Sequence, residues 1–158
     1  MQSMSQVAGL FIASDGALPM VSVEQVEAVA RRGLVGDRYF ENRGKYSGRE
    51  GWGANVTLIE AESFQAIKAG HAVEFSGAML RRNIVTEGIR IDTLIDREFR
   101  CGGTVLRGTK HYPPCIHLAH LLGRRDVLRY FAYCGGIGAE VIVDGRIQLG
   151  DRIELIAS

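Results

Sequence analysis

Residues 141–155 have the sequence VIVDGRIQLGDRIEL, which contains the clearest structural signal in the chain. Two short runs of apolar and polar residues flank Asp144 and Gly145, a pair suited to the positive φ angles of a two-residue hairpin turn. Ile147 and Leu149 alternate with polar neighbours, so one face of the second strand is expected to be buried. A second Gly-Asp pair then turns the chain into another alternating strand. The stretch therefore predicts a β-hairpin followed by a further strand.

The rest of the chain shows the same alternation of short apolar runs and turn residues. Glycine accounts for 20 of the 158 residues, which is typical of many short strands joined by tight turns. Further strands are predicted at 7–13, 55–60, 82–86, 98–100 and 104–108. Short helices are predicted at 61–68, 115–122 and 126–133.

A predicted helix end and a predicted loop complete this interpretation. Gly70 is expected to end the first helix, and the segment 39–54, which has no hydrophobic period, is predicted to be a mobile loop. A chain of 158 residues is long enough to bury about two-thirds of its unfolded surface. The sequence therefore predicts a mainly β protein: a β-barrel with a few short helices at its rim, in a single domain over residues 1–158.

Composition and charge exclude several classes of protein. With 19 Lys and Arg against 18 Asp and Glu, the net charge of +1 gives no overall attraction to nucleic acid or an anionic membrane. No stretch approaches the roughly 20 apolar residues needed to span a bilayer, and the start has no basic region typical of a signal peptide. Three cysteines are too few for a disulfide framework. We expect a cytoplasmic protein with at least one free thiol and a small-molecule substrate.

The most chemically suggestive stretch is Pro113-Pro114-Cys115. Pro114 suits the first position of a helix, which would place Cys115 in the first turn. The unpaired amides there favour a thiolate, which is what sulfur transfer or soft-metal ligation requires. Free cysteine is also a common core residue, so Cys115 could equally be a small buried hydrophobe. Three basic neighbours would strengthen the thiolate if they face it: Lys110, His111 and His117.

The other cysteines and histidines favour packing over chemistry. Cys101 lies between predicted strands and Cys134 precedes a double glycine, so both are expected to pack. His117 and His120 share a helix face while Cys115 points elsewhere, and no Cys-x-x-Cys pair is present. The spacing therefore disfavours a structural zinc site.

Two further segments carry candidate anion-binding groups. Arg81-Arg82-Asn83 opens a predicted strand, where alternation places Arg82 on one side and its two neighbours on the other. A guanidinium and an amide at that strand end would clamp a phosphate or a pterin ring, although many such arginines are simply solvated. The loop at 33–40 carries adjacent opposite charges; taken alone, it indicates a turn in which its aspartate caps backbone amides, and it is not a P-loop.

Together, the ordered motifs resemble the MOSC domain family. In chain order they are GLVGDRYF (33–40), VTLIEAE (56–62), RRNIVTEGI (81–89), REFRCGGTVLRGT (97–109), PPC (113–115) and GGIGAEVIVDGRIQLGDRIEL (135–155). The resemblance implies a MOSC-type β-barrel and a single essential cysteine, which maps onto Cys115 and carries a persulfide or ligates molybdenum. It also implies that Asp37, Arg82 and Asn83 lie near that cysteine. Two positions depart from the usual pattern: Cys134 replaces an arginine, and Asp96 replaces a glycine.

The resemblance implies more than one function. The leading one is a molybdenum-cofactor protein that reduces N-hydroxylated compounds, with Cys115 as catalytic residue and metal ligand, and with electrons from a separate reductase. The alternative is a persulfide carrier loaded by a separate cysteine desulfurase, because this chain has no pyridoxal phosphate domain. A third is a ligand-binding module with an inert cysteine, and a monomer or a homodimer fits each. The cofactor-binding candidates are Asp37, Arg38, Arg81, Arg82, Asn83 and His117.

Overall fold

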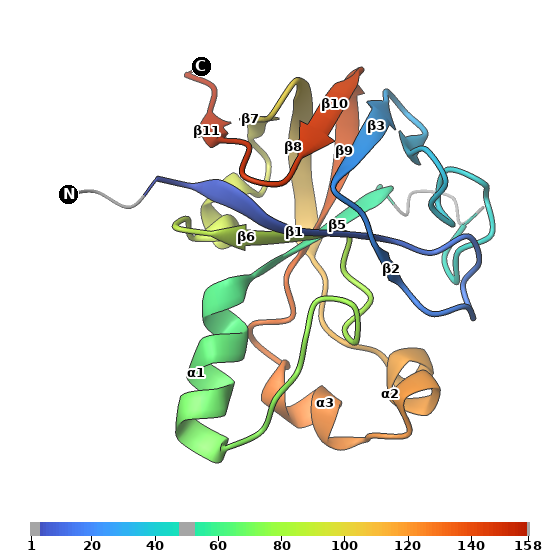
Figure 1. The fold of residues 1–158 in the computed structure, drawn as a ribbon, viewed down its shortest axis with the longest axis vertical. Coiled ribbons are helices and arrows are strands. Elements are labelled where there is room, and N and C mark those ends of the chain that lie inside the picture. The colour runs from blue at the N-terminus through green and yellow to red at the C-terminus, as the bar shows by residue number, and fades with distance from the viewer. Residues whose placement is uncertain (1–3, 48–52, 158) are drawn as a thin grey trace.

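The computed structural model describes residues 4–47 and 53–157 (Figure 1). Within these residues, eight strands form one strongly curled sheet and three form a small second sheet beside it. In spatial order the large sheet contains β11 (Ile153–Leu155), β7 (Glu98–Cys101), β8 (Thr104–His111), β9 (Ile137–Val143), β5 (Val56–Glu60), β6 (Ile84–Glu87), β1 (Gln6–Ile12) and β2 (Val21–Ser22). The small sheet contains β10 (Gly145–Gln148), β3 (Gln25–Val29) and β4 (Gly33–Leu34). The β5–β6 pair is parallel and the other strand pairs are antiparallel.

The predicted mainly β, barrel-like fold is confirmed as a half-barrel. Its interior is a continuous apolar cluster to which both sheets contribute, including Leu58, Phe99 and Ile147, all fully buried. Ile147 is buried as its alternation predicts, whereas Leu149 lies beyond the end of β10 and is exposed. Burial of such apolar side chains is the main favourable contribution to folding.

The predicted hairpin at Asp144-Gly145 is wrong. Its two flanking segments are strands, but β9 pairs with β8 and β5, whereas β10 pairs with β3 in the small sheet. Next to its pairing with β5, β9 also accepts a hydrogen bond from the Arg31 amide at the Val141 carbonyl. Neither turn residue has a positive φ. Tertiary pairing overrode the local turn signal, because both edges of β9 are occupied and β10 pairs elsewhere.

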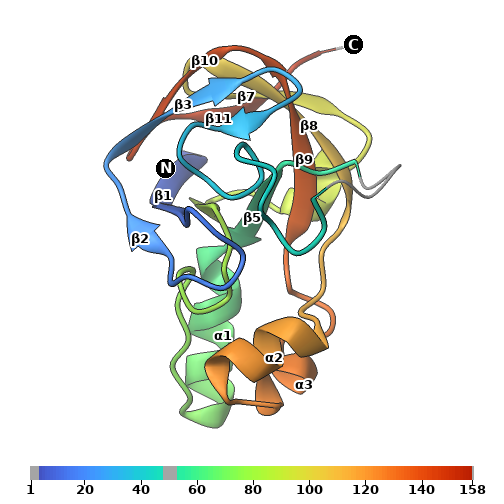
Figure 2. The ribbon, with the colours of Figure 1, turned by 90° about the vertical axis from the view of Figure 1, so that its right-hand side faces the viewer.

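The helices gather at one end of the half-barrel, with α2 nearest the viewer in Figure 2. They are α1 (Ala61–His71), α2 (Ile116–Leu122) and α3 (Asp126–Tyr130), and a 3-10 turn, η1, covers Ile91–Leu94. Under them lies a second apolar cluster that includes Ile59, Phe75 and Phe131. Strand β5 is buried on both faces, since Leu58 packs in the barrel and its neighbour Ile59 packs under the helices. In the part of the chain described, no helix has the length and apolar character to cross a bilayer.

The boundaries of α1 differ from the prediction. Gly70 lies inside the helix, which continues to His71 and ends at Ala72, with φ 56° and ψ 35°. This left-handed conformation lets the Ala72 amide donate to the Lys68 carbonyl at 2.9 Å. Glycine adopts it without steric cost, whereas alanine does not.

Ala72→Gly is therefore expected to stabilise the protein by about 0.5–1 kcal/mol, because the backbone strain at the helix end is removed. Urea unfolding followed by circular dichroism measures the change. Ala66→Gly, in the middle of the same helix, is the matched control and should destabilise by about 1 kcal/mol. Equal destabilisation by both substitutions would contradict the left-handed cap.

Candidate functional site

A cavity of about 170 Å³ lies where the end of β8 and the start of α2 meet three connecting segments, and Cys115 lines it. The helix begins at Ile116, and Cys115 is its N-cap, with extended φ and ψ of −119° and 169°. The prediction that Pro114 is the first helical residue is therefore wrong by two positions, and Cys115 precedes the first turn instead of lying in it. The Cys115 carbonyl accepts the Ala119 amide at 3.1 Å, which starts the helix and fixes the backbone that carries the thiol.

The cavity wall is strongly cationic. None of its described lining residues is an aspartate or a glutamate. An anion in this space would therefore be attracted from several directions without competition from a lining carboxylate. The basic lining residues are Arg38, Lys45, Arg81, Arg82, His111 and His117.

Arg82 is the most buried of these basic residues, with 3% of its surface exposed. Its guanidinium donates to three backbone carbonyls, those of Leu80, Tyr112 and Gly135, at 2.7–2.8 Å. Within the described residues no carboxylate lies at salt-bridge distance from it. Burial lowers the pKa of Arg82 to about 10. A buried cation that has carbonyl dipoles and an aromatic ring as partners, but no carboxylate, favours a bound anion.

Arg81 and Arg38 are the other two arginines that line the cavity. Arg81 has a φ of 58° and lies before β6, so the predicted strand alternation does not apply to it. It donates to the carbonyls of Asp15 and Leu18, and burial, followed by the nearby Arg38, lowers its pKa to about 10. Arg38 is buried and donates to the Arg81 carbonyl at 3.0 Å, which ties the two arginines together.

Asp37 and Asn83 support the cavity without lining it. Asp37 is fully buried; its carboxylate accepts the amides of Ala13 and Tyr39 and a 2.9 Å contact from Arg38. This is the amide-capping turn that the loop sequence indicated. Asn83 is also fully buried: its Oδ1 accepts the Thr57 amide at 3.0 Å and its Nδ2 donates to the Phe11 carbonyl. Asn83 therefore joins β5 to β1 directly behind the arginines.

His117 and the other histidines differ in position. His117 lines the cavity, and its Nε2 lies 3.4 Å from the Gly16 carbonyl, linking α2 to the loop after β1. His111 lines this cavity and a neighbouring one, whereas His120 is exposed. No group of three or more His, Cys, Asp or Glu side chains in residues 4–47 and 53–157 is arranged to hold a metal ion.

Three tyrosines in the cavity were not identified from the sequence. The hydroxyl oxygens of Tyr39 and Tyr112 lie 2.7 Å apart, and the Tyr46 ring meets the Tyr112 ring edge-on at 6.4 Å. The Arg38 guanidinium lies 4.8 Å from the Tyr39 ring centroid, and that of Arg82 lies 4.6 Å from the Tyr112 ring. Two features of the sequence could have indicated them: the Arg38-Tyr39 pair in the loop, and Tyr112 directly before the double proline.

All three thiols are free. Cys101 has no exposed surface, packs in the barrel core, and has its pKa raised to about 12 by burial. Cys134 is partly buried beside a different cavity and donates to the Tyr130 carbonyl at 3.5 Å. Burial raises the pKa of Cys134 as well. The packing interpretation of Cys101 therefore agrees with the structure.

Alkylation should distinguish the Cys115 thiol from the Cys101 thiol. At pH 8 iodoacetamide is expected to modify Cys115 in the folded protein and to leave Cys101 unmodified, since Cys101 is sealed from reagent and its thiolate is suppressed by burial. Peptide mass spectrometry after a timed pulse measures this, with urea-unfolded protein as the control in which all three react. Modification of Cys101 at the rate of Cys115 in folded protein would contradict the arrangement.

The sequence profile of the MOSC domain family matches residues 45–154. No curated protein matches the sequence. Among solved structures, the YuaD protein of Bacillus subtilis superposes with a TM-score of 0.79 at 18% identity, covering 98% of this chain and 97% of that one. YiiM from Geobacillus stearothermophilus gives 0.71 at 14% identity, covering 97% and 75%. YiiM from Escherichia coli gives 0.68 at 16% identity, covering 100% and 71%. At these identities the structures show a shared fold.

Proposed function

The chain belongs to the MOSC domain family, and on that premise we propose that it binds the molybdenum cofactor in the Cys115 cavity and reduces N-hydroxylated compounds there. One observation carries the proposal: a partly exposed thiol shares a cavity with six basic side chains and with no carboxylate among the described lining residues. A soft sulfur ligand and a cationic wall are what a metal on an anionic carrier requires.

The residues present fit this cofactor. Thiolate sulfur is a suitable ligand for a soft or borderline transition metal, so Cys115 would hold the molybdenum. Arg82 is a buried cation without a carboxylate partner in the described residues, and Arg81 is tied beside it through Arg38, so these groups would hold the phosphate. The rings of Tyr39, Tyr46 and Tyr112 give the wall an aromatic part suited to contact with a pterin. When bound, the cofactor supplies two-electron transfer at its metal.

The chain's own groups hold the arginines of the cavity in position for the ligand. Asp37 and Asn83 fix Arg38 and the start of β6 from behind, so the cationic groups are held in place before any ligand arrives. Arg82 keeps its orientation through three carbonyl hydrogen bonds and retains further N–H groups for an anion. A separate reductase would supply the electrons.

The alternative function is a persulfide carrier. It is favoured by the partial exposure of Cys115 in the cavity wall, where the persulfide of a separate cysteine desulfurase would reach it. The surrounding cations would stabilise the persulfide anion after transfer. In this case no metal is held.

Two measurements on freshly purified protein separate these functions. Protein from a host that makes the cofactor is mixed with reduced viologen and 6-N-hydroxylaminopurine, and amine formation is followed by chromatography. Turnover supports the reductase. A mass increase of one sulfur atom on the Cys115 peptide, without turnover, supports the carrier. The absence of both signals, in protein whose cofactor and thiol are intact, would contradict both functions.

A further inference from the structure

We propose that Tyr39 donates the proton to the hydroxyl oxygen that leaves the substrate, and that Tyr112 is the positioning residue that prepares Tyr39 for this step. This inference rests on the reductase function proposed above. It assigns to two tyrosines of the cavity wall a role beyond packing. Both residues line the same cavity as Cys115, so a substrate held there can meet the thiol-bearing wall and a phenol together.

The hydrogen bond between the two phenols has a preferred direction. Tyr112 is nearly buried, with 9% of its surface exposed, and burial raises its pKa. The charge of an ionised Tyr39 and the hydrogen bond between the two phenols raise the pKa of Tyr112 further. Because Tyr112 is the more buried phenol, we assign it as the donor to the Tyr39 oxygen, 2.7 Å away. The proton of the more exposed Tyr39 is left for the cavity.

The surroundings also stabilise Tyr39 after it has given up its proton. The phenolate oxygen would keep the hydrogen bond from Tyr112, and the Arg38 guanidinium lies 4.8 Å from the ring centroid. Negative charge on Tyr39 or on Cys115 raises the pKa of Arg82, so both groups lie within electrostatic reach of that guanidinium. The buried Arg82 guanidinium thus interacts electrostatically with both the Cys115 thiol and the Tyr39 phenol.

The reaction needs such a donor. Reduction of an N-hydroxylated compound takes up two electrons and two protons and yields the amine and water. The nitrogen–oxygen bond breaks, the electron pair from the separate reductase remains on nitrogen, and the oxygen leaves as water after it receives the Tyr39 proton. Solvent supplies the second proton to nitrogen and reprotonates Tyr39. Without a donor the leaving group is hydroxide, and a positioned general acid contributes typically ~10²–10⁴-fold.

Tyr39→Phe is the direct test, with 6-N-hydroxylaminopurine as the substrate. We expect kcat to fall about 100-fold or more, with KM and the molybdenum content unchanged, because the ring and its packing remain. Added imidazolium, a small weak acid, should partly restore kcat in Tyr39→Phe. Tyr112→Phe should lower kcat less and show no such rescue, since its donor is still present. Tyr133→Phe, a fully exposed phenol outside the cavity, is the matched control and should match the wild type.

A second readout does not depend on turnover. Proton NMR of the purified protein should show a slowly exchanging phenol hydroxyl signal that is lost in Tyr112→Phe and in Tyr39→Phe and kept in Tyr133→Phe. Its persistence in Tyr112→Phe would overturn the assigned direction of the bond. If the wild type is active and Tyr39→Phe equals Tyr133→Phe, the proton-donor role is wrong while the proposed function stands. If cofactor-loaded wild type is inactive, the proposed function fails and this inference fails with it.

Discussion

Cys115→Ser is expected to lower the rate of N-hydroxyl reduction by more than about 100-fold. Losing even an outer-shell partner of a metal ligand typically costs ~10–100-fold, and serine replaces the sulfur itself with a hard, neutral hydroxyl. The fold should be unaffected, since Cys115 is partly exposed and the helix that follows depends on its backbone carbonyl. Turnover with reduced viologen and the circular dichroism spectrum are the two measurements.

Cys134→Ser is the matched control for this substitution. Its thiol lines a different cavity and donates to the Tyr130 carbonyl. Its turnover should stay within about twofold of wild type. Equal loss of activity in the two variants, or full activity in Cys115→Ser, would contradict a role for this one sulfur.

Asp37→Ala is expected to destabilise the protein by about 3–5 kcal/mol, because it leaves the buried Arg38 guanidinium without its carboxylate. It also removes the acceptor of the Ala13 and Tyr39 amides. Urea unfolding at neutral pH, analysed by linear extrapolation, gives the change in the free energy of unfolding.

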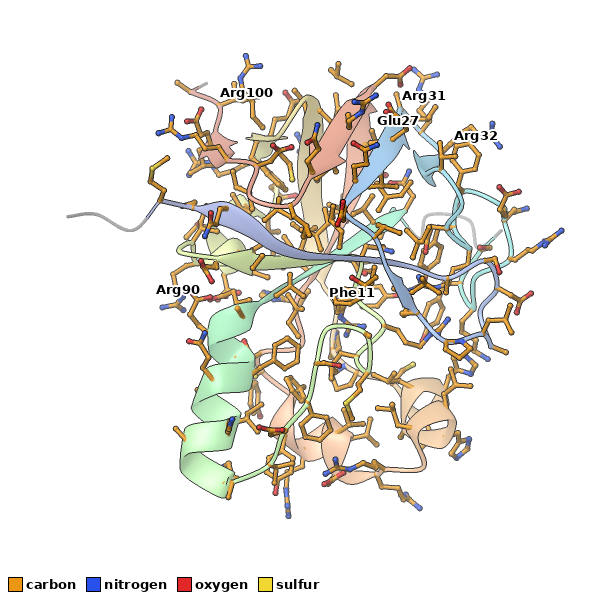
Figure 3. All side chains as sticks on the ribbon, in the orientation of Figure 1. Phe11, Glu27, Arg31, Arg32, Arg90 and Arg100 are labelled. Carbon is orange, nitrogen blue, oxygen red and sulfur yellow. The ribbon has the colours of Figure 1, made fainter. Side chains whose placement is uncertain are left out.

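Glu27→Ala provides the comparison, since it breaks an ion pair of similar length. The Arg146–Glu27 contact measures 2.8 Å, but both side chains are more than half exposed, and Figure 3 shows Glu27 at the surface of β3. Solvent screening limits such a pair to roughly 0–1 kcal/mol. A loss in Asp37→Ala no larger than in Glu27→Ala would contradict the burial of the Asp37 pair.

Strands that alternate or are buried on both faces could be predicted from the sequence. The apolar runs of β1 and β5 were placed within one residue of their observed ends. Strand β3 was missed, although Val26 and Ala28 alternate with polar neighbours and are its buried positions. Its glutamate and its short length weakened the period, and its partner, β10, lies more than a hundred residues away.

Long-range pairing explains the largest error. The Asp144-Gly145 pair carries a strong local hairpin signal, but the edges of β9 are occupied by segments distant in sequence. A local sequence pattern cannot show that both edges of β9 are already paired. In the same way, Gly70 suggested a helix end, whereas α1 continues to His71 and is capped by the left-handed Ala72.

The candidate site could be predicted only in part. Cys115, Arg38, Arg81, Arg82 and His117 meet in one cavity. Residue type could not reveal that Asp37 and Asn83 lie behind that cavity, because carboxylate and amide groups serve binding and buried support equally well. Arginines are also ambiguous in sequence: Arg31, Arg90 and Arg100 lie at the periphery in Figure 3, whereas Arg82 is buried.

The cavity is therefore built from two layers of side chains. The lining layer supplies the thiol, cations and phenols, and the layer behind it supplies the carboxylate and amide that hold them. Such preorganisation lowers the cost of ordering charged side chains around a ligand.

Elemental analysis of wild type and Cys115→Ser, both purified from a cofactor-producing host, tests the central claim most directly. We predict close to stoichiometric molybdenum in the wild type and background levels in Cys115→Ser, since the thiolate is the proposed protein ligand. Equal molybdenum in the two proteins, or none in a wild type whose thiol is intact, would contradict the account.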